Sequence, residues 1–356
     1  MTRGGRGRTG PGGAVVTGVG VAARFRLAAL PTPLIAAPRL AEVLGIGALY
    51  VKRDDLTGFA FAGNKARPLE FLLADAIAEG ADTLVTGGAP GSNFCTAVAA
   101  AARRAGLGCE LVIAGQSEPP GPPGHLGPAL ALARSWGAAV RWTGVPERDS
   151  VDTGLPAAAA GLAACGRRPY LIPRGGATGR GAVGYALAAV ELREQLAVHG
   201  ADGARVVVAA GSGGTLAGLV AGNVLMGRPL RLIGGSVSRP AQETAGRVRA
   251  LAQSCLVLLA GSGLPGLPGT DTVSGDDIGL QDVVVADARG PGHGLASPEG
   301  TAAAEQAMRT EGLMVDPVYT AKALALVSRH ADGGDMVFWH TGGQLDVVAM
   351  AAGSGR

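Results

Sequence analysis

The chain has 356 residues, 47% of them hydrophobic, which is enough for two domains with buried cores. Five of its 31 basic residues fall within residues 1–26, where there is no acid, and the other 330 residues carry 26 basic and 28 acidic groups. No basic stripe interleaved with aromatic residues appears, which argues against a nucleic-acid-binding protein. The four cysteines have no paired spacing, which argues against a disulfide framework or a metal site, and no charge-free apolar stretch is long enough to span a bilayer.

These features predict a cytoplasmic protein without a signal peptide or membrane anchor, and a Gly/Arg-rich disordered tail over residues 1–20. After the tail, strand-like and helix-like runs alternate along the chain. Helices are expected at 68–79, 92–105, 126–136, 155–165, 180–198, 215–225, 298–311 and 321–329. Strands are expected at 82–86, 109–114, 138–142, 170–173, 206–210, 230–237 and 335–340, and the Gly/Pro/Ser-rich stretch 258–275 is expected to be a loop.

This alternation predicts an α/β protein in which helices cover parallel sheets. Active sites in such proteins lie beyond the carboxyl ends of the strands. The loops expected at those ends are 87–93, 174–179, 211–215 and 341–343.

A lysine follows a glycine turn at Gly63-Asn64-Lys65, directly before the first expected helix. A partly desolvated lysine in such a position can attack a carbonyl group. A random lysine is usually a surface residue, so Lys65 needs a companion motif to be a functional candidate.

The companion is Gly211-Ser212-Gly213-Gly214-Thr215, which joins an apolar strand to a helix. Backbone N–H groups in such a turn form a cradle for a phosphate at the helix N-terminus. The turn lacks the lysine of a nucleoside-triphosphate loop and the glycine spacing of a dinucleotide site. A Schiff-base lysine together with a phosphate cradle is what pyridoxal 5'-phosphate requires.

Most of the chain from Pro31 onward resembles the pyridoxal-phosphate family that contains D-cysteine desulfhydrase and 1-aminocyclopropane-1-carboxylate deaminase. The resemblance implies the two-domain tryptophan synthase β-like fold (fold type II). The matching stretches, in the family's order, are Lys52-Arg53-Asp54-Asp55-Leu56-Thr57-Gly58, Gly63-Asn64-Lys65, Ser92-Asn93, Ile172-Pro173-Arg174-Gly175-Gly176, Gly211-Ser212-Gly213-Gly214-Thr215, Asp316-Pro317-Val318-Tyr319-Thr320 and His340-Thr341-Gly342-Gly343.

The resemblance also implies roles for individual residues. Lys65 would hold the cofactor covalently and move the α-proton, and Asn93 would bond the cofactor's ring hydroxyl. Ser92 would contact the substrate carboxylate or assist proton transfer, and Tyr319 would position or polarise the substrate. The residues implied to bind phosphate are Gly211, Ser212, Gly213, Gly214 and Thr215, and those implied to lie near the substrate are Ser92, His293, Tyr319, Thr341 and Gly342.

Thr320 would meet the pyridine nitrogen, where the deaminases carry a glutamate. A threonine cannot supply a charge that keeps the ring protonated, and it favours a neutral ring. Expulsion of a β-substituent still proceeds with a neutral ring, whereas opening a cyclopropane is more demanding. Thr320 therefore favours the desulfhydrase branch.

The chain departs from the family at four positions. They are Pro68, where a base commonly helps to hold phosphate, Gly91, where glutamine is usual, Phe94 in place of histidine, and His293 in place of tyrosine. Other interpretations also stay open for single residues. Ser92 could cap a helix, Tyr319 could be a core aromatic, and His293 could be a solvated loop residue.

We therefore expect a lyase that performs β-elimination on a small amino acid, with D-cysteine or a related sulfur amino acid as the lead substrate. The alternatives are a 1-aminocyclopropane-1-carboxylate deaminase, a biosynthetic lyase for a modified cysteine, and, from another class, a non-catalytic relative that only binds a ligand. A large cofactor-binding domain is expected over 21–65 and 179–356, and a small domain over 66–178. The resemblance further implies a homodimer.

Overall fold

The computed structural model describes residues 16–353 except 19 and 118–126. These residues form two compact units. The smaller unit comprises the described residues up to Ala28 together with Lys65–Ala177, and the larger unit comprises Ala29–Asn64 together with the described residues from Thr178 onward. None of the helices in this part of the chain is long and apolar enough to cross a membrane.

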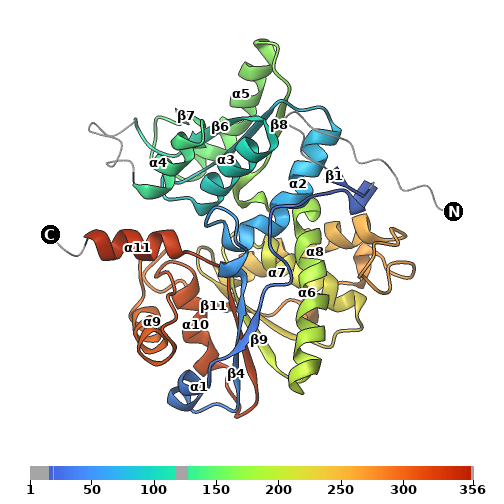
Figure 1. The fold of residues 1–356 in the computed structure, drawn as a ribbon, viewed down its shortest axis with the longest axis vertical. Helices are drawn as coiled ribbons and strands as arrows, with labels where there is room; N and C mark the ends of the chain where they lie inside the picture. Colours follow the sequence, from blue (N-terminus) through green and yellow to red (C-terminus); the bar gives the residue numbers. More distant parts are fainter. Residues whose placement is uncertain (1–15, 19, 118–126, 354–356) are drawn as a thin grey trace. The chain divides into compact units, whose positions relative to one another are not determined.

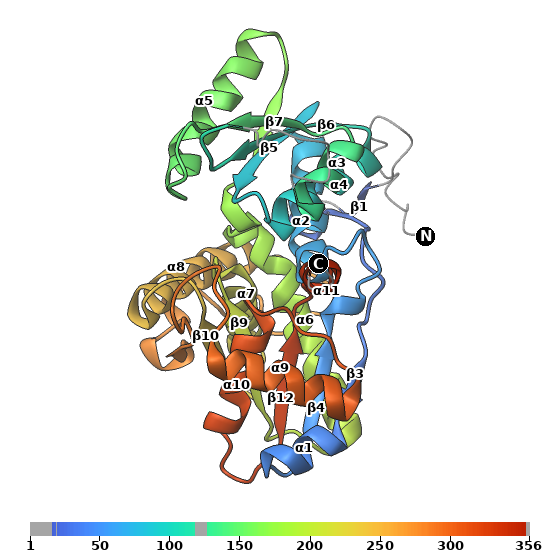
Figure 2. The same ribbon diagram turned by 90° about the vertical axis from the view of Figure 1, so that its left-hand side faces the viewer.

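The elements of the smaller unit are β1 (Val16–Thr17), β2 (Arg24–Phe25), α2 (Ala66–Ala78), β5 (Thr83–Gly88), α3 (Asn93–Ala105), β6 (Gly108–Ile113), α4 (Pro128–Ser135), β7 (Ala139–Trp142), α5 (Ser150–Ala164) and β8 (Pro169–Leu171). Its parallel four-stranded sheet has the order β7-β6-β5-β8, and β1 and β2 form a separate antiparallel pair. Figure 2 shows α5 on one face of this sheet and α3 and α4 on the other. A buried cluster on the α5 face includes Val85, Val112 and Leu155.

The elements of the larger unit are β3 (Leu34–Ala36), α1 (Pro38–Leu44), β4 (Leu49–Arg53), α6 (Gly179–His199), β9 (Arg205–Ala210), α7 (Gly214–Leu225), β10 (Arg231–Ser236), α8 (Ala241–Leu259), β11 (Val285–Asp287), α9 (Pro298–Glu311), α10 (Thr320–Arg329), β12 (Met336–His340) and α11 (Gln344–Gly353). Its six-stranded sheet has the order β11-β10-β9-β12-β4-β3 and is parallel except for β3. Figure 1 shows α1, α9 and α10 on one side of this sheet and α6 on the other.

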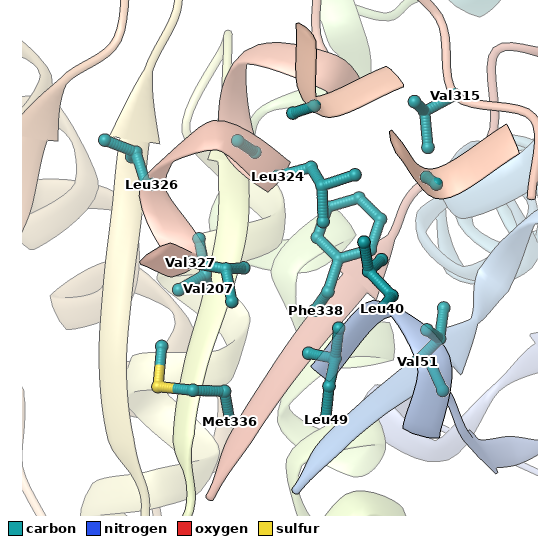
Figure 3. Packing of buried hydrophobic residues seen from close by; sticks show 14 of the residues in the cluster. Leu40, Leu49, Val51, Val207, Val315, Leu324, Leu326, Val327, Met336 and Phe338 are labelled. Atoms are coloured by element: carbon teal, nitrogen blue, oxygen red, sulfur yellow. The ribbon is translucent and has the colours of Figure 1, made fainter. Parts of the chain in front are cut away.

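Strand β12 shows how this sheet is buried on both faces. Met336 and Phe338 pack into the cluster under α1, α9 and α10, where they meet Leu49 and Leu324 (Figure 3). The alternate residue Trp339 faces the other way and makes an edge-on contact with Tyr185 of α6. Each fully buried large side chain of this kind contributes about 1.5–3 kcal/mol. The strand therefore fixes the sheet between two helical layers, and the carboxyl ends of its strands carry the loops of interest.

The alternating α/β class agrees with the expectation, but three assignments need correction. Helix α5 begins at Ser150 rather than 155, and Pro156 lies inside the helix. The stretch 258–275 is not all loop, since α8 extends to Leu259. No helix was expected over 241–259.

The third correction concerns the domains. Residues 21–28 were assigned to the large domain, but they belong to the smaller unit, whose later part begins at Lys65 and ends at Ala177. The reason is the buried carboxylate of Glu70 on α2, which pairs with Arg24 and accepts the N–H groups of Leu27 and Ala28 at 2.7 and 2.8 Å. The expected tail over 1–20 lies mostly outside the described residues, but Val16–Thr17 pairs with Arg24–Phe25 in a short hairpin.

Candidate active site

The glycine turn after β9 has the geometry of an anion cradle. Gly213 caps α7 with φ +92°, a left-handed conformation that other residues adopt at a cost. A Cβ atom added there would lie 3.1 Å from Val248 Cγ2 of α8. The backbone conformation therefore favours glycine at this position. Because glycine has no side chain, residue 213 does not cover the N–H groups at the start of α7.

Tyr319 lies against the first residue of this turn. A Cβ atom on Gly211 would stand 3.2 Å from Tyr319 Cε1, so the ring packs where only glycine leaves room. The Tyr319 hydroxyl is 3.3 Å from His293 Nε2, and the two rings meet edge-on with centroids 6.2 Å apart. The structure thus brings together three sequence candidates from separate parts of the chain, Gly211, His293 and Tyr319.

A buried lysine anchors the loop that carries His293. Lys322, on the first turn of α10, donates to the carbonyl oxygens of Arg289 at 2.6 Å and Gly292 at 2.8 Å. Its side chain is buried, which lowers the pKa of the ammonium, while the negative charge of Asp316 opposes that shift. The position of His293 beside Tyr319 therefore depends on a cation that the sequence did not single out.

Asp316 organises the start of α10. Its buried carboxylate accepts the N–H groups of Val318, Tyr319 and Thr320 at 2.8–3.0 Å, so it satisfies donors at the helix N-terminus. Thr320 Oγ1 lies 2.5 Å from Asp316 Oδ2 and also accepts the Asp316 N–H at 2.6 Å. The Thr320 hydroxyl is buried and is engaged by Asp316.

The loop 341–343 is held by its neighbours on both sides. His340 Nε2 bonds to the Met314 carbonyl at 2.7 Å, and its Nδ1 accepts the Gly342 N–H at 3.2 Å, which fixes a neutral imidazole. Burial lowers the pKa of His340, in agreement with this arrangement. The Thr341 carbonyl accepts the Asn64 N–H at 2.8 Å. This loop therefore lies against the turn that leads into Lys65.

The Lys65 turn is tied to the cradle through Asn64. Asn64 Nδ2 donates to Thr215 Oγ1 at 2.9 Å. The Tyr185 hydroxyl donates to Asp54 Oδ2 at 2.5 Å and lies 3.3 Å from the Asn64 carbonyl oxygen. Gly63 has φ +52°, and a Cβ atom there would lie 2.4 Å from the Thr341 carbonyl oxygen. Because Lys65 is the next residue in the chain, these contacts fix the backbone from which its side chain starts.

Lys65 itself is half-buried and belongs to the smaller unit, where it immediately precedes α2. Pro68 is in the first turn of this helix, where its missing N–H leaves no helical bond unmade. The preceding residue, Arg67, is buried, and no sequence motif singles it out.

Ser92 and Asn93 lie at the N-terminus of α3, at the carboxyl end of β5. Ser92 Oγ accepts the Cys95 N–H at 3.3 Å, so it caps the helix, a role that is compatible with catalysis. Phe94 is buried, and its ring lies 2.7 Å from the point where a Cβ on Gly176 would be. The change from histidine at 94 therefore has a packing explanation within this unit, whereas Gly91 is exposed.

These residues fit pyridoxal phosphate. In the larger unit, Gly211 and Gly213 put no side chain on the turn, and Asn64 links that turn to the backbone that leads into Lys65. In the smaller unit, Asn93 supplies an amide at the start of α3. No cluster of three or more His, Cys, Asp or Glu side chains suited to a metal is found in the described part of the chain.

Comparison with known proteins decides the family. Residues 25–342 match the model of the family described as pyridoxal-phosphate dependent enzyme. The chain belongs to the pyridoxal-phosphate-dependent enzyme family. Its cofactor is pyridoxal phosphate, and it is a lyase-type enzyme of the α/β fold expected from the sequence.

The relatives and structural neighbours are similar over nearly the whole chain. Proteins named D-cysteine desulfhydrase from Salmonella choleraesuis and Salmonella paratyphi C are each 39% identical over 334 residues, 90% of this chain and 94% of theirs. A crystal structure titled as an ACC deaminase homologue matches with a TM-score of 0.76 and 31% identity over 91% of this chain and 93% of that one. O-ureido-L-serine synthase matches with a TM-score of 0.60 and 16% identity over 88% of this chain and 90% of that one, which shows the shared fold.

Proposed function

We propose that this enzyme converts D-cysteine and water into pyruvate, ammonia and hydrogen sulfide. The observation that carries the proposal is the 39% identity to D-cysteine desulfhydrases across 90% of the chain. Related sulfur amino acids that carry a leaving group on the β-carbon are expected to react in the same way.

Bound pyridoxal phosphate supplies an electron-withdrawing ring that stabilises negative charge on the substrate α-carbon. Lys65 is proposed to hold the cofactor covalently and then, as the free amine, to remove the α-proton. Gly211, Ser212, Gly213, Gly214 and Thr215 are proposed to bind the phosphate, and Asn93 the ring hydroxyl. The Asn64–Thr215 bond at 2.9 Å supports this assignment, because it couples the lysine turn to the cradle.

Tyr319 is proposed to position the substrate and to donate a proton to the departing sulfur. His293 Nε2, 3.3 Å from the hydroxyl, is proposed to restore the Tyr319 proton with one taken up from water. Ser92 and the backbone of Thr341 and Gly342 are proposed to hold the substrate carboxylate. In this mechanism the C–S bond breaks, its electron pair leaves with sulfur, and the remaining enamine is hydrolysed to pyruvate and ammonia.

The deciding experiment compares kcat/KM for D-cysteine, L-cysteine and 1-aminocyclopropane-1-carboxylate at one pH, with pyruvate, sulfide and 2-oxobutyrate measured together. We expect equal amounts of pyruvate and sulfide from D-cysteine and a lower kcat/KM for the other two substrates. The resemblance to an ACC deaminase homologue makes the cyclopropane the second candidate. A higher kcat/KM with the cyclopropane would overturn the proposal in its favour.

Two further outcomes separate the remaining alternatives. A yellow protein that holds the cofactor but turns over none of the three substrates would favour a lyase for a modified cysteine. A colourless protein that takes up no cofactor would favour a non-catalytic relative. Each result would contradict the proposed desulfhydrase activity.

We also propose that the enzyme works in the cytoplasm as a homodimer. All four cysteines are free thiols, as a reducing compartment allows. Light scattering of the purified protein tests the assembly, and a monomer at micromolar concentration would contradict it. Fractionation of cells that express the protein tests the compartment.

A further inference from the structure

Two arginines bond to the outside of the glycine turn. Arg239 Nη1 donates to the Gly211 carbonyl at 3.2 Å, and Arg247 Nε donates to the Ser212 carbonyl at 2.9 Å. Ser238 Oγ adds a bond to the Gly211 carbonyl at 3.1 Å. Two consecutive carbonyl groups of the turn therefore face cations.

These carbonyls belong to the same peptide groups as two N–H donors of the turn. The Gly211 carbonyl shares a planar trans peptide with the Ser212 N–H, and the Ser212 carbonyl shares one with the Gly213 N–H. In a trans peptide the N–H points opposite to the C=O. A cation at the oxygen polarises the whole group and makes the N–H on the other side a stronger donor.

The need for such cations comes from the turn itself. Residues 211–215 contain no basic side chain, so the positive charge beside a bound phosphate must come from residues outside the turn. Arg247 belongs to α8, the helix whose Val248 packs against Gly213. The same helix therefore constrains the conformation of the turn and places a positive charge beside it. Arg239 forms an ion pair with Glu243 at 2.9 Å, so it contributes less positive charge to the turn than Arg247 does.

We propose that Arg247, assisted by Arg239, is a positioning residue for the cofactor phosphate: it strengthens the N–H donors of the turn from behind, without touching the phosphate. The inference rests on the proposed assignment of the phosphate to residues 211–215, and it adds the source of the positive charge.

The test measures the Kd of the purified protein for pyridoxal 5'-phosphate and for pyridoxal, which lacks the phosphate. Arg247→Gln is expected to raise the Kd for pyridoxal phosphate only about threefold to tenfold, because the Arg247 side chain is exposed and its charge acts through solvent. Arg239→Gln should raise this Kd less, because Glu243 offsets the charge of Arg239. The Kd for pyridoxal should not change. Arg247→Lys, which keeps the charge, should lie between wild type and Arg247→Gln.

Arg249→Gln is the matched control, since Arg249 is on the same helix but donates to the Ile278 carbonyl at 3.2 Å. It should bind both ligands as wild type does. A second readout is the phosphorus NMR titration of bound cofactor, where loss of positive charge in Arg247→Gln should raise the phosphate pKa.

The inference is overturned if Arg247→Gln leaves the Kd for pyridoxal phosphate unchanged. It is also overturned if that variant weakens pyridoxal equally, or if Arg249→Gln has the same effect, because either result indicates a general structural role. Failure of the wild-type protein to bind pyridoxal phosphate would instead overturn the proposed function on which the inference rests.

Discussion

Replacing Gly213 with alanine tests the cradle at its most constrained residue. The backbone there has φ +92°, and an added Cβ would lie 3.1 Å from Val248 Cγ2, closer than most Cβ contacts. Alanine can relieve this only by rotating the peptide groups of the turn or by displacing α8. Either movement redirects the N–H groups at the start of α7.

The expected magnitude has two parts. A non-glycine residue in the left-handed region costs about 1–2 kcal/mol, which should appear as lost stability of the protein without cofactor. Losing one well-aligned bond from an N–H to a charged phosphate costs about 1.5–3 kcal/mol, which raises the Kd for pyridoxal phosphate about 10- to 150-fold.

Gly227→Ala provides the control. Gly227 lies just beyond the other end of α7 with φ +80°, and an added Cβ meets nothing within 4 Å. This variant should lose about 1–2 kcal/mol in denaturant unfolding and keep the wild-type Kd. The assay is cofactor titration of both variants beside their unfolding curves. A wild-type Kd for Gly213→Ala, or equal losses of affinity in the two variants, would refute the phosphate assignment.

Three further changes have defined outcomes. Lys65→Ala should abolish turnover and the long-wavelength absorbance of the lysine-bound cofactor while the phosphate still binds; retained full activity would end the proposed mechanism. Lys322→Met removes two bonds to loop carbonyls, so hydrogen exchange around His293 should speed up and kcat with D-cysteine should fall, and unchanged exchange would contradict the anchoring role. Burial lowers the pKa of His340, so this imidazole is protonated at a lower pH in the folded protein than in the unfolded chain. The free energy of unfolding should therefore be highest above pH 6.5 and fall as the pH drops below that value. Urea unfolding curves measured across this pH range should show a smaller fall for His340→Gln than for the wild-type protein.

The elements predicted well from the sequence are those whose burial pattern and punctuation agree. Helix α9 runs over Pro298–Glu311 as expected, because Ser297 caps it, Pro298 opens it and Gly312 ends it in a left-handed conformation. Helix α8 was missed although its buried residues Thr244, Val248, Ala252 and Leu256 repeat every four positions. Polar residues and a glycine stand between these positions, so the apolar helix face is hard to recognise from the sequence.

The candidate site was predictable where a motif is local and less so where side chains meet from distant segments. The glycine turn and Lys65 are each recognisable from adjacent residues, so their types and spacing are enough to single them out as candidates. Arg239 and Arg247 showed no motif. One signal was available for Arg239, since it follows β10, the parallel neighbour of β9, and the carboxyl ends of neighbouring parallel strands lie together.

Asp316 limits what the Thr320 hydroxyl can offer to the pyridine nitrogen. A hydroxyl has one proton to donate, and that of Thr320 is directed at Asp316 Oδ2, 2.5 Å away, while the Asp316 N–H occupies one of its acceptor sites. What the oxygen still offers is a lone pair. If Thr320 meets the pyridine nitrogen as the family resemblance implies, it is therefore better placed to accept a hydrogen bond from a protonated ring than to donate one to a neutral ring. The enzyme's expected preference for elimination over ring opening then depends on Asp316 as well as on the absence of glutamate at 320, while its 39% identity to D-cysteine desulfhydrases favours elimination independently of both residues.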